Sequence, residues 1–206
     1  MNKACSRSAI IILAGLLQAC SVLPRPETVA VEYFTLDVPV ALVVQVDTAG
    51  PTLLIARPQV RADLDTPRMT YRQQDYTLRY YARSRWADTP AHLLLPGLIE
   101  SFEASGRFAA VLRAGSPATP RLRLDTEVLE FSQDYRVQPS RFQIRLRAQL
   151  VDLNTRHILA SRTFTMDRPA EAQTPYGGAQ AANAAWQALL PELVAFCTAA
   201  LPSATP

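Results

Sequence analysis

Residues 121–131 read RLRLDTEVLEF and residues 141–150 read RFQIRLRAQL, and these two stretches are the clearest structural signal in the chain. In each, apolar and polar side chains alternate with a period of two, the pattern of a strand with one buried and one solvated face. The apolar positions are Leu122, Leu124, Thr126, Val128, Phe142, Ile144, Leu146, Ala148 and Leu150. After Val128 the alternation slips to Leu129 and Phe131, which predicts a β-bulge.

A third strand is predicted to follow these two. Asn154-Thr155 turns the chain, and the next strand should cover about 157–166 with Ile158, Ala160 and Phe164 on its apolar face. Three consecutive strands of this kind favour an antiparallel meander. The arginines of its polar face are expected to face carboxylates of the neighbouring strand as a solvated surface, with contact to an acidic partner as the alternative.

Shorter strands are predicted earlier in the chain, at 31–36, 52–60, 69–72, 76–81 and 108–113. Pro58 should place the end of the second at a sheet edge or a bulge, because proline cannot donate to a strand ladder. The third and fourth form a hairpin rich in tyrosine. The apolar stretch 38–47 is compatible with either an extra strand or a packed loop.

Two helices complete the pattern. Thr89-Pro90 is a typical helix start for a helix over roughly 90–105, which Pro96-Gly97 should kink or delay. After Gly177-Gly178, an alanine-rich helix is predicted over 179–200. Its apolar stripe consists of Trp186, Leu189, Leu190, Leu193 and Phe196, and Pro191 should introduce a local kink.

Together these elements predict an α+β fold, with a mixed, mainly antiparallel sheet covered by two helices. The length of 206 residues suits a single domain, which we place at 29–201, followed by a frayed tail at 202–206. Hydrophobic residues make up 49% and charged residues 19% of the chain, as in a globular protein.

The sequence offers little for catalysis. Its seven glycines form no phosphate-binding loop, and no G-x-S-x-G marks a serine nucleophile. His92 and His157 stand apart from each other and from the cysteines, so no metal-ligand cluster is predicted and both are expected at the surface. We therefore assign no catalytic, cofactor-binding or metal-binding residue, and we expect binding or scaffolding.

The N-terminus has the pattern of a bacterial lipoprotein signal. Lys3 and Arg7 precede an apolar run at 9–17, which is too short for the roughly 20 residues of a membrane-spanning helix. It ends in Leu17-Gln18-Ala19-Cys20, which resembles a lipobox, so lipidation of Cys20 is predicted. The alternatives are an ordinary secretory signal or an apolar helix with an incidental cysteine.

Residues 1–19 would then be a signal peptide, and 20–28 the lipidated cysteine with a proline-containing tether. Without residues 1–19 the chain holds 19 arginines and 18 acidic residues, so its formal charge falls from +3 to +1. A nearly neutral domain has no electrostatic footprint for nucleic acid. Cys197 remains as the one unmodified thiol, and we expect it to be a buried small hydrophobic residue.

The order of short motifs resembles the ABC-type transport auxiliary lipoprotein family. After the lipobox these motifs are Tyr33-Phe34-Thr35-Leu36, Arg85-Trp86-Ala87-Asp88, Val128-Leu129-Glu130-Phe131, Leu150-Val151-Asp152 and Ile158-Leu159-Ala160-Ser161. The final alanine-rich helix closes the series, and the resemblance covers essentially all of 20–200. The interruption at Pro96-Gly97 departs from the smoother helix expected there.

The resemblance implies a non-enzymatic lipoprotein of the outer membrane, facing the periplasm. It implies MCE-domain proteins with their permease and ATPase as partners in moving lipids between the two membranes. The residue after the cysteine, Ser21, also favours the outer membrane by resemblance to enterobacterial sorting. The alternatives are a lipid-binding carrier and an envelope-assembly lipoprotein. A partner built as a ring would favour a homo-oligomer here.

Trp86 has two interpretations at this stage. As a hydrophobic staple it would pack at the entry of the helix that follows it. As an exposed aromatic residue it would be a possible contact for a partner protein.

Overall fold

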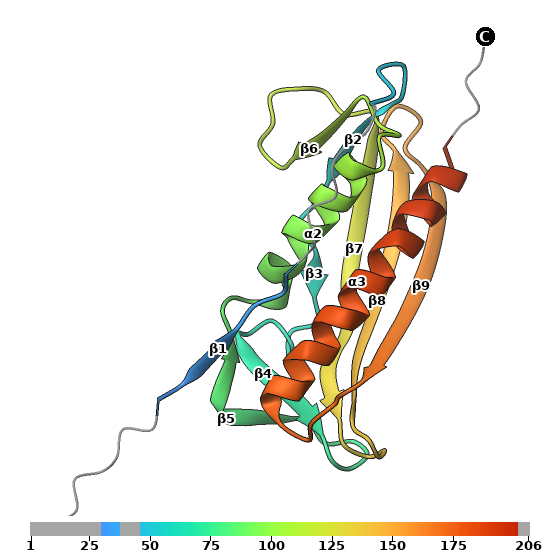
Figure 1. Cartoon of the computed structure of the whole chain (residues 1–206). Coiled ribbons are helices and arrows are strands. Elements are labelled where there is room, and N and C mark those ends of the chain that lie inside the picture. The colour runs from blue at the N-terminus through green and yellow to red at the C-terminus, as the bar shows by residue number, and fades with distance from the viewer. Residues whose placement is uncertain (1–29, 38–45, 202–206) are drawn as a thin grey trace, which may run out of the picture. The chain divides into compact units, whose positions relative to one another are not determined.

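The protein is described by a computed structural model, which covers residues 30–37 and 46–201 (Figure 1). Most of the apolar stretch 38–47, the lipobox and the tail 202–206 therefore lie outside the described residues. The strands are β1 (Glu32–Phe34), β2 (Thr52–Ile55), β3 (Gln59–Val60), β4 (Arg68–Arg72), β5 (Arg79–Trp86), β6 (Ala110–Arg113), β7 (Leu122–Asp134), β8 (Arg141–Asp152) and β9 (His157–Pro169). The helices are α2 (Pro90–Ala104) and α3 (Pro175–Ala199).

The predicted antiparallel meander is confirmed by the pairing of β7 with β8 and of β8 with β9. The β7–β8 ladder runs from Leu122 opposite Asp152 to Asp134 opposite Arg141. The register shifts between Val128 and Glu130, as the slip in the pattern predicts. All nine predicted apolar positions of the two strands are buried.

The rest of the sheet is mixed, and β7 is its centre. Its second edge pairs with β2, β3 and β4, each running parallel to it. β4 and β5 form the predicted hairpin, β1 lies parallel to β5, and β6 lies parallel to β2. The stretch 52–60 is divided into β2 and β3 by the segment that contains Pro58, so one predicted strand becomes two short ones along the same neighbour.

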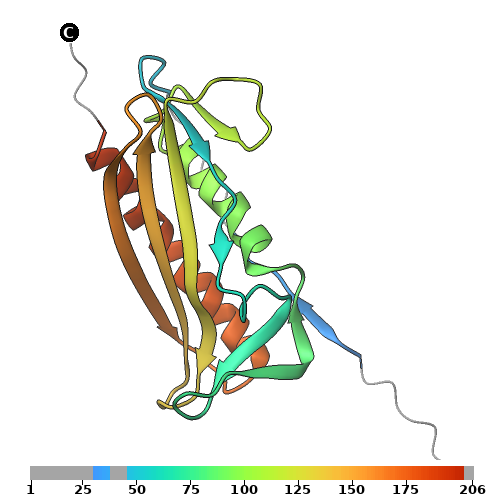
Figure 2. The same cartoon turned by 180° about the vertical axis from the view of Figure 1, so that it is seen from behind.

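Both helices cover the same face of the sheet (Figures 1 and 2). α2 begins at Pro90 and continues through Pro96-Gly97 to Ala104, so the predicted late start is wrong. α3 begins at Pro175, ahead of the two glycines that were expected to precede it. Its first turn is capped by Thr174, whose Oγ1 accepts a hydrogen bond from the amide of Gly177 at 3.1 Å.

Glycine is needed at both positions because neighbouring parts of the chain pass too close for a side chain. A Cβ on Gly177 would collide with the backbone of Ala172, and a Cβ on Gly178 would collide with the side chain of Gln133 on β7. The first turn of α3 can therefore lie directly against the end of β7.

Two predicted positions are corrected by the structure. Trp86 is only 1% exposed, and its ring lies 5.1 Å from that of Phe131 and 5.8 Å from that of Phe142. It is a core residue, so its prediction as an exposed partner contact is wrong. Ile158 is 56% exposed, because a register shift near the start of β9 places Leu159 against the core instead.

The core lies between α3, α2 and the inner face of the sheet. Trp186, Leu189 and Leu193 of α3 are fully buried. Cys197 lies on the same face of the helix, and it is buried as predicted. Burial raises the pKa of its thiol to about 12, because a thiolate is poorly solvated there.

Candidate functional site

The site residues expected from the sequence do not come together. Cys20 lies outside the described residues, and Trp86 is in the core. His92 is exposed on α2 with its Nδ1 3.0 Å from Asp88 Oδ1, and His157 is exposed at the start of β9. In the described part of the chain, no group of three histidine, cysteine, aspartate or glutamate residues could hold a metal ion. The described helices include none that is long and apolar enough to cross a membrane.

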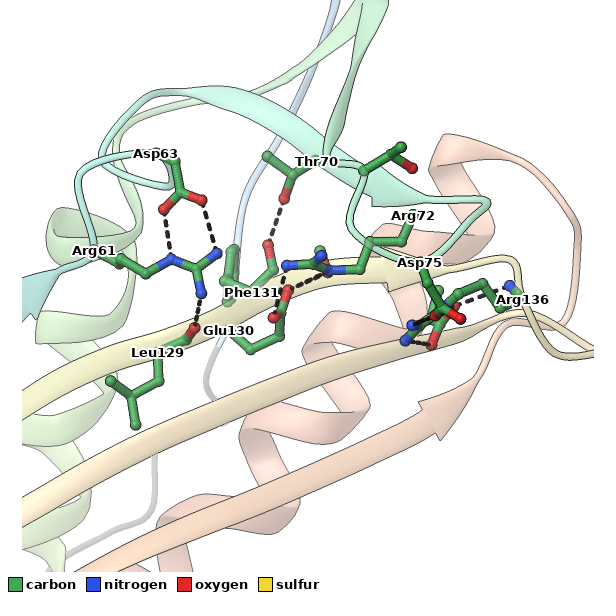
Figure 3. Close-up of polar contacts among 12 residues, drawn as sticks. Arg61, Asp63, Thr70, Arg72, Asp75, Leu129, Glu130, Phe131 and Arg136 are labelled. Carbon is green, nitrogen blue, oxygen red and sulfur yellow. Dashed lines mark hydrogen bonds and ion pairs between the residues drawn. The ribbon is translucent and has the colours of Figure 1, made fainter.

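A cluster of polar side chains lies where the β4–β5 hairpin meets β7 (Figure 3). Arg72 on β4 donates from Nε and Nη2 to the two carboxylate oxygens of Glu130 on β7, at 3.3 and 3.1 Å. Ser132 donates to the same carboxylate at 2.5 Å, and Glu130 is only 6% exposed. Because an unpaired charge is costly at such a position, this ion pair fixes where the hairpin lies on β7.

The bulge in β7 is held by a second arginine. Arg61 forms an ion pair with Asp63, at 2.5 and 2.8 Å, and its Nη1 donates to the carbonyl of Leu129 at 3.2 Å. Leu129 is the extra residue of the bulge, so Arg61 binds the chain where the β7–β8 register shifts. The bulge was predictable from the alternation, but its arginine partner was not, because 68 positions separate the two residues.

A group of tyrosines extends the contact between the β4–β5 hairpin and β7 toward the ends of β4 and β7. The hydroxyl of Tyr81 lies 2.9 Å from Gln133 Oε1 and 2.6 Å from the hydroxyl of Tyr135. The ring of Tyr71 lies 4.5 Å from that of Tyr81. Burial raises the pKa of both Tyr81 and Tyr135 above the ordinary value, so both remain neutral hydroxyls. The tyrosines of the predicted hairpin therefore pack and hydrogen-bond between strands.

Gln133 connects this group to the rest of the fold. Its Nε2 donates to Ser140 Oγ at 2.9 Å, and its side chain packs against Gly178 of α3. It is completely buried. A single side chain thus joins the hairpin, the β7–β8 loop and the first turn of α3.

Arg136 ties the two neighbouring loops together. Its guanidinium donates to Asp134 at 2.7 and 2.9 Å and to Asp75, in the β4–β5 turn, at 2.5 Å (Figure 3). The hydrogen bonds from Arg136 hold the pKa of Asp134 below its ordinary value. The turn of the hairpin and the β7–β8 loop therefore lie side by side at one end of the sheet.

These loops present exposed apolar side chains. Tyr76 is fully exposed, and Val137 of the neighbouring loop is 44% exposed. Tyr76 also has a φ of 62°, the left-handed conformation that bulky residues rarely adopt. We call Tyr76, Val137 and the loops that carry them, 73–78 and 135–140, the loop tip.

A second surface feature lies between the N-terminal segment and α3. Asn183 accepts a hydrogen bond from the amide of Asp37 at 2.7 Å and donates to the carbonyl of Thr35 at 3.1 Å. Beside these contacts is a groove of about 460 Å³. It is lined by Tyr33, Phe34, Thr35, Asp37, Tyr176, Ala179, Gln180, Asn183, Ala184 and Gln187. No sequence pattern predicts this groove, because amides on a helix surface usually face solvent.

The polar cluster between the β4–β5 hairpin and β7 has a structural role. Across the residues that the structure describes, its arginines lie on the carboxylates of Glu130, Asp63, Asp75 and Asp134. Ion pairs of this kind position loops and strands relative to one another, and the surface that they support is the loop tip.

Comparison with known protein families finds a match over most of the described fold. The family model for the ABC-type transport auxiliary lipoprotein component matches residues 34–194. No curated protein matches the sequence significantly.

Solved structures show the same fold. Protein XCC0632 from Xanthomonas campestris is 28% identical, with a TM-score of 0.72 over 82% of this chain and 96% of that one. An uncharacterized protein is 14% identical, with a TM-score of 0.64 over 81% and 98% of the two chains. The hypothetical protein CT253 from Chlamydia trachomatis is 9% identical, with a TM-score of 0.50 over 72% and 96%. The last two support the fold alone.

Proposed function

The chain belongs to the ABC-type transport auxiliary lipoprotein family, and on this premise we propose that it is a non-enzymatic accessory subunit of an MCE-type system that moves lipids between the inner and outer membranes. The match over residues 34–194 carries the proposal, because it spans nearly all of the described fold. The family description itself establishes an auxiliary lipoprotein of an ABC transport system.

The proposed place of work is the periplasmic face of the outer membrane. Cys20 in the lipobox would carry the lipid, and Ser21 after it favours export to the outer membrane. The tether that follows Cys20, up to residue 28, would then connect the anchor to the domain.

The proposed partner is an MCE-domain protein with its permease and ATPase. The sequence has no phosphate-binding loop, so the energy for transport has to come from a partner that hydrolyses ATP. The loop tip and the groove along α3 are the exposed features that would be available for contact with this partner. A homo-oligomer that matches the symmetry of the MCE assembly is part of the proposal.

The anchor is tested by Cys20→Ser. We expect this variant to lose palmitate labelling and to leave the membrane fraction, while Cys197→Ser keeps both, since Cys197 is buried in the core. A Cys20→Ser protein that still labels and still sediments with the outer membrane would show that the lipobox assignment is wrong.

The transport role is tested by deletion and co-purification. Loss of the gene should reproduce the loss of the cognate MCE component, with sensitivity to detergents and hydrophobic antibiotics. The lipidated protein should co-purify with that component from solubilised envelopes. A normal permeability barrier together with no co-purification would reject the role.

The carrier alternative needs an apolar space for a lipid, and the envelope-assembly alternative needs a partner unrelated to transport. The inner face of α3 is filled by Trp186, Leu189 and Leu193, all fully buried, which gives the carrier little support. Lipid extraction from purified protein distinguishes a carrier from an accessory subunit, because only a carrier retains stoichiometric non-covalent lipid.

A further inference from the structure

β1 is an edge strand whose outer side has no neighbouring strand. Among the strands that the structure describes, it pairs with β5 alone. In a parallel pair, alternate residues bond to the neighbouring strand, and the carbonyl of Phe34 accepts from the amide of Ala87 at 2.7 Å. The amides and carbonyls of Tyr33 and Thr35 therefore point away from β5. Backbone groups at such an edge can pair with a further strand.

Part of this edge is occupied by amide side chains of α3. Asn183 donates from Nδ2 to the carbonyl of Thr35 at 3.1 Å, and its Oδ1 accepts from the amide of Asp37 at 2.7 Å. Gln187 donates to the carbonyl of Asp37 at 3.2 Å. A neighbouring strand would bind the same carbonyl and the same amide, so Asn183 takes its place. The edge is closed at Thr35–Asp37 and remains open at Tyr33, because no side chain or turn of the described residues binds the outer backbone groups of Tyr33.

The open part of the edge faces the groove along α3. Tyr33, Phe34 and Thr35 line one side of this groove, and residues of α3 from Tyr176 to Gln187 line the other. The side chains of Tyr33 and Tyr176 are 65% and 60% exposed, so they offer apolar contact to a chain that lies between them. With a helix on its far side, the groove of about 460 Å³ accommodates a single extended chain, because a sheet behind that chain would meet α3.

The charge at the groove is negative. Asp37 is the charged residue among those that line it. Alternation along β1 places the side chain of Glu32 on the same face of the strand as Phe34. Neither carboxylate forms an ion pair with a residue of 30–37 or 46–201. A chain that carries lysine or arginine would therefore be the complementary occupant.

We propose that the groove along α3 binds an extended, basic segment of another protein, which adds to β1 as a strand through the backbone of Tyr33. Hydrogen bonds to the amide and carbonyl of Tyr33 would provide affinity, and contacts with Tyr176 and Asp37 would provide selectivity. Because β1 is only 3 residues long, the added ladder is short and the complex is expected to be reversible. The proposal goes beyond the transport role, since it depends neither on the lipid anchor nor on an MCE partner.

The test separates backbone pairing from side-chain contact at one position. Tyr33→Pro removes the outward amide, which β5 does not use, and leaves the amide of Phe34 for β5. Tyr33→Ala is the matched control, because it removes the ring and keeps the amide. The unsubstituted full chain, purified in detergent, is screened against a display library of random peptides. Enriched peptides are synthesised and titrated against each variant and against Asp37→Asn by fluorescence anisotropy.

We expect enriched peptides to contain lysine or arginine and to bind Tyr33→Pro about 2- to 10-fold more weakly than Tyr33→Ala, the range of one backbone hydrogen bond. Asp37→Asn should also weaken binding. N-methylation of one alternate set of peptide amides should abolish binding while the other set is tolerated, because only one edge of an added strand faces β1. The methylated peptides decide the question even if Tyr33→Pro lowers Tm.

Three results would overturn the proposal. The first is a library without enriched peptides. The second is equal loss of binding for both methylated sets, together with equal affinity for Tyr33→Pro and Tyr33→Ala. The third is enrichment of peptides without basic residues that bind Asp37→Asn unchanged. Self-association of the unsubstituted chain that Tyr33→Pro abolishes would instead reassign the edge to a second copy.

Discussion

Gly178→Ala tests whether the first turn of α3 depends on the close approach of Gln133. In an ordinary helix this change is favourable, by up to about 1 kcal/mol, because alanine loses less backbone entropy than glycine. Here the added Cβ would lie 2.7 Å from Cδ of Gln133 and closer still to its Oε1. Gln133 is completely buried, so its side chain has no solvent-filled space into which it can rotate.

The magnitude follows from the hydrogen bonds that Gln133 would lose. It contacts the hydroxyls of Tyr81 and Ser140, each at 2.9 Å. Each bond contributes about 0.5–1.5 kcal/mol, and a buried amide left unsatisfied costs about 1–3 kcal/mol. After the gain in helix propensity, we expect Gly178→Ala to lower the free energy of unfolding by about 1–3 kcal/mol.

The assay is chemical denaturation followed by circular dichroism, supported by thermal melts, where each kcal/mol moves Tm by about 2–4 °C in a protein of this size. Gln133→Ala is the matched background, because it removes the side chain that the new methyl group would meet. In that background Gly178→Ala should be neutral or stabilising. A Gly178→Ala protein that is more stable than the unsubstituted chain would refute the close approach.

Two further predictions concern the core. Leu146→Ala should lower the free energy of unfolding by about 2–5 kcal/mol, whereas the exposed neighbour Arg145→Ala should change it by less than about 0.5 kcal/mol; equal melts for the two variants would mean that the faces of β8 are inverted. In a Cys5→Ser/Cys20→Ser chain, the thiol of Cys197, with its pKa raised to about 12, should resist thiol reagents at pH 8 until denaturant is added. Rapid labelling of the native protein would contradict the burial of Cys197 on α3. The raised pKa of this thiol also means that the free energy of unfolding falls as pH rises above about 9, where the unfolded thiol loses its proton first.

The parts of the fold that depend on local patterns could be predicted from the amino-acid sequence. The alternation around Leu124 and Ile144 established the long strands, because a period of two admits only one face toward the core. The slip after Val128 located the bulge, and Thr89-Pro90 located the start of α2. The lipobox likewise depends on contiguous residues, and so does the family resemblance, whose motifs are short and ordered along the chain.

Contacts between residues far apart in the sequence could not be predicted and become visible in the three-dimensional fold. Arg72 forms an ion pair with Glu130, and Gln133 packs against Gly178. No local sequence pattern predicts either contact. Trp86 shows the same limit, since its burial depends on Phe131 and Phe142 reaching it from other strands. The loop tip also belongs to this class: Arg136 binds Asp75 across 61 positions, because the parallel pairing of β4 with β7 brings two turns to one end of the sheet.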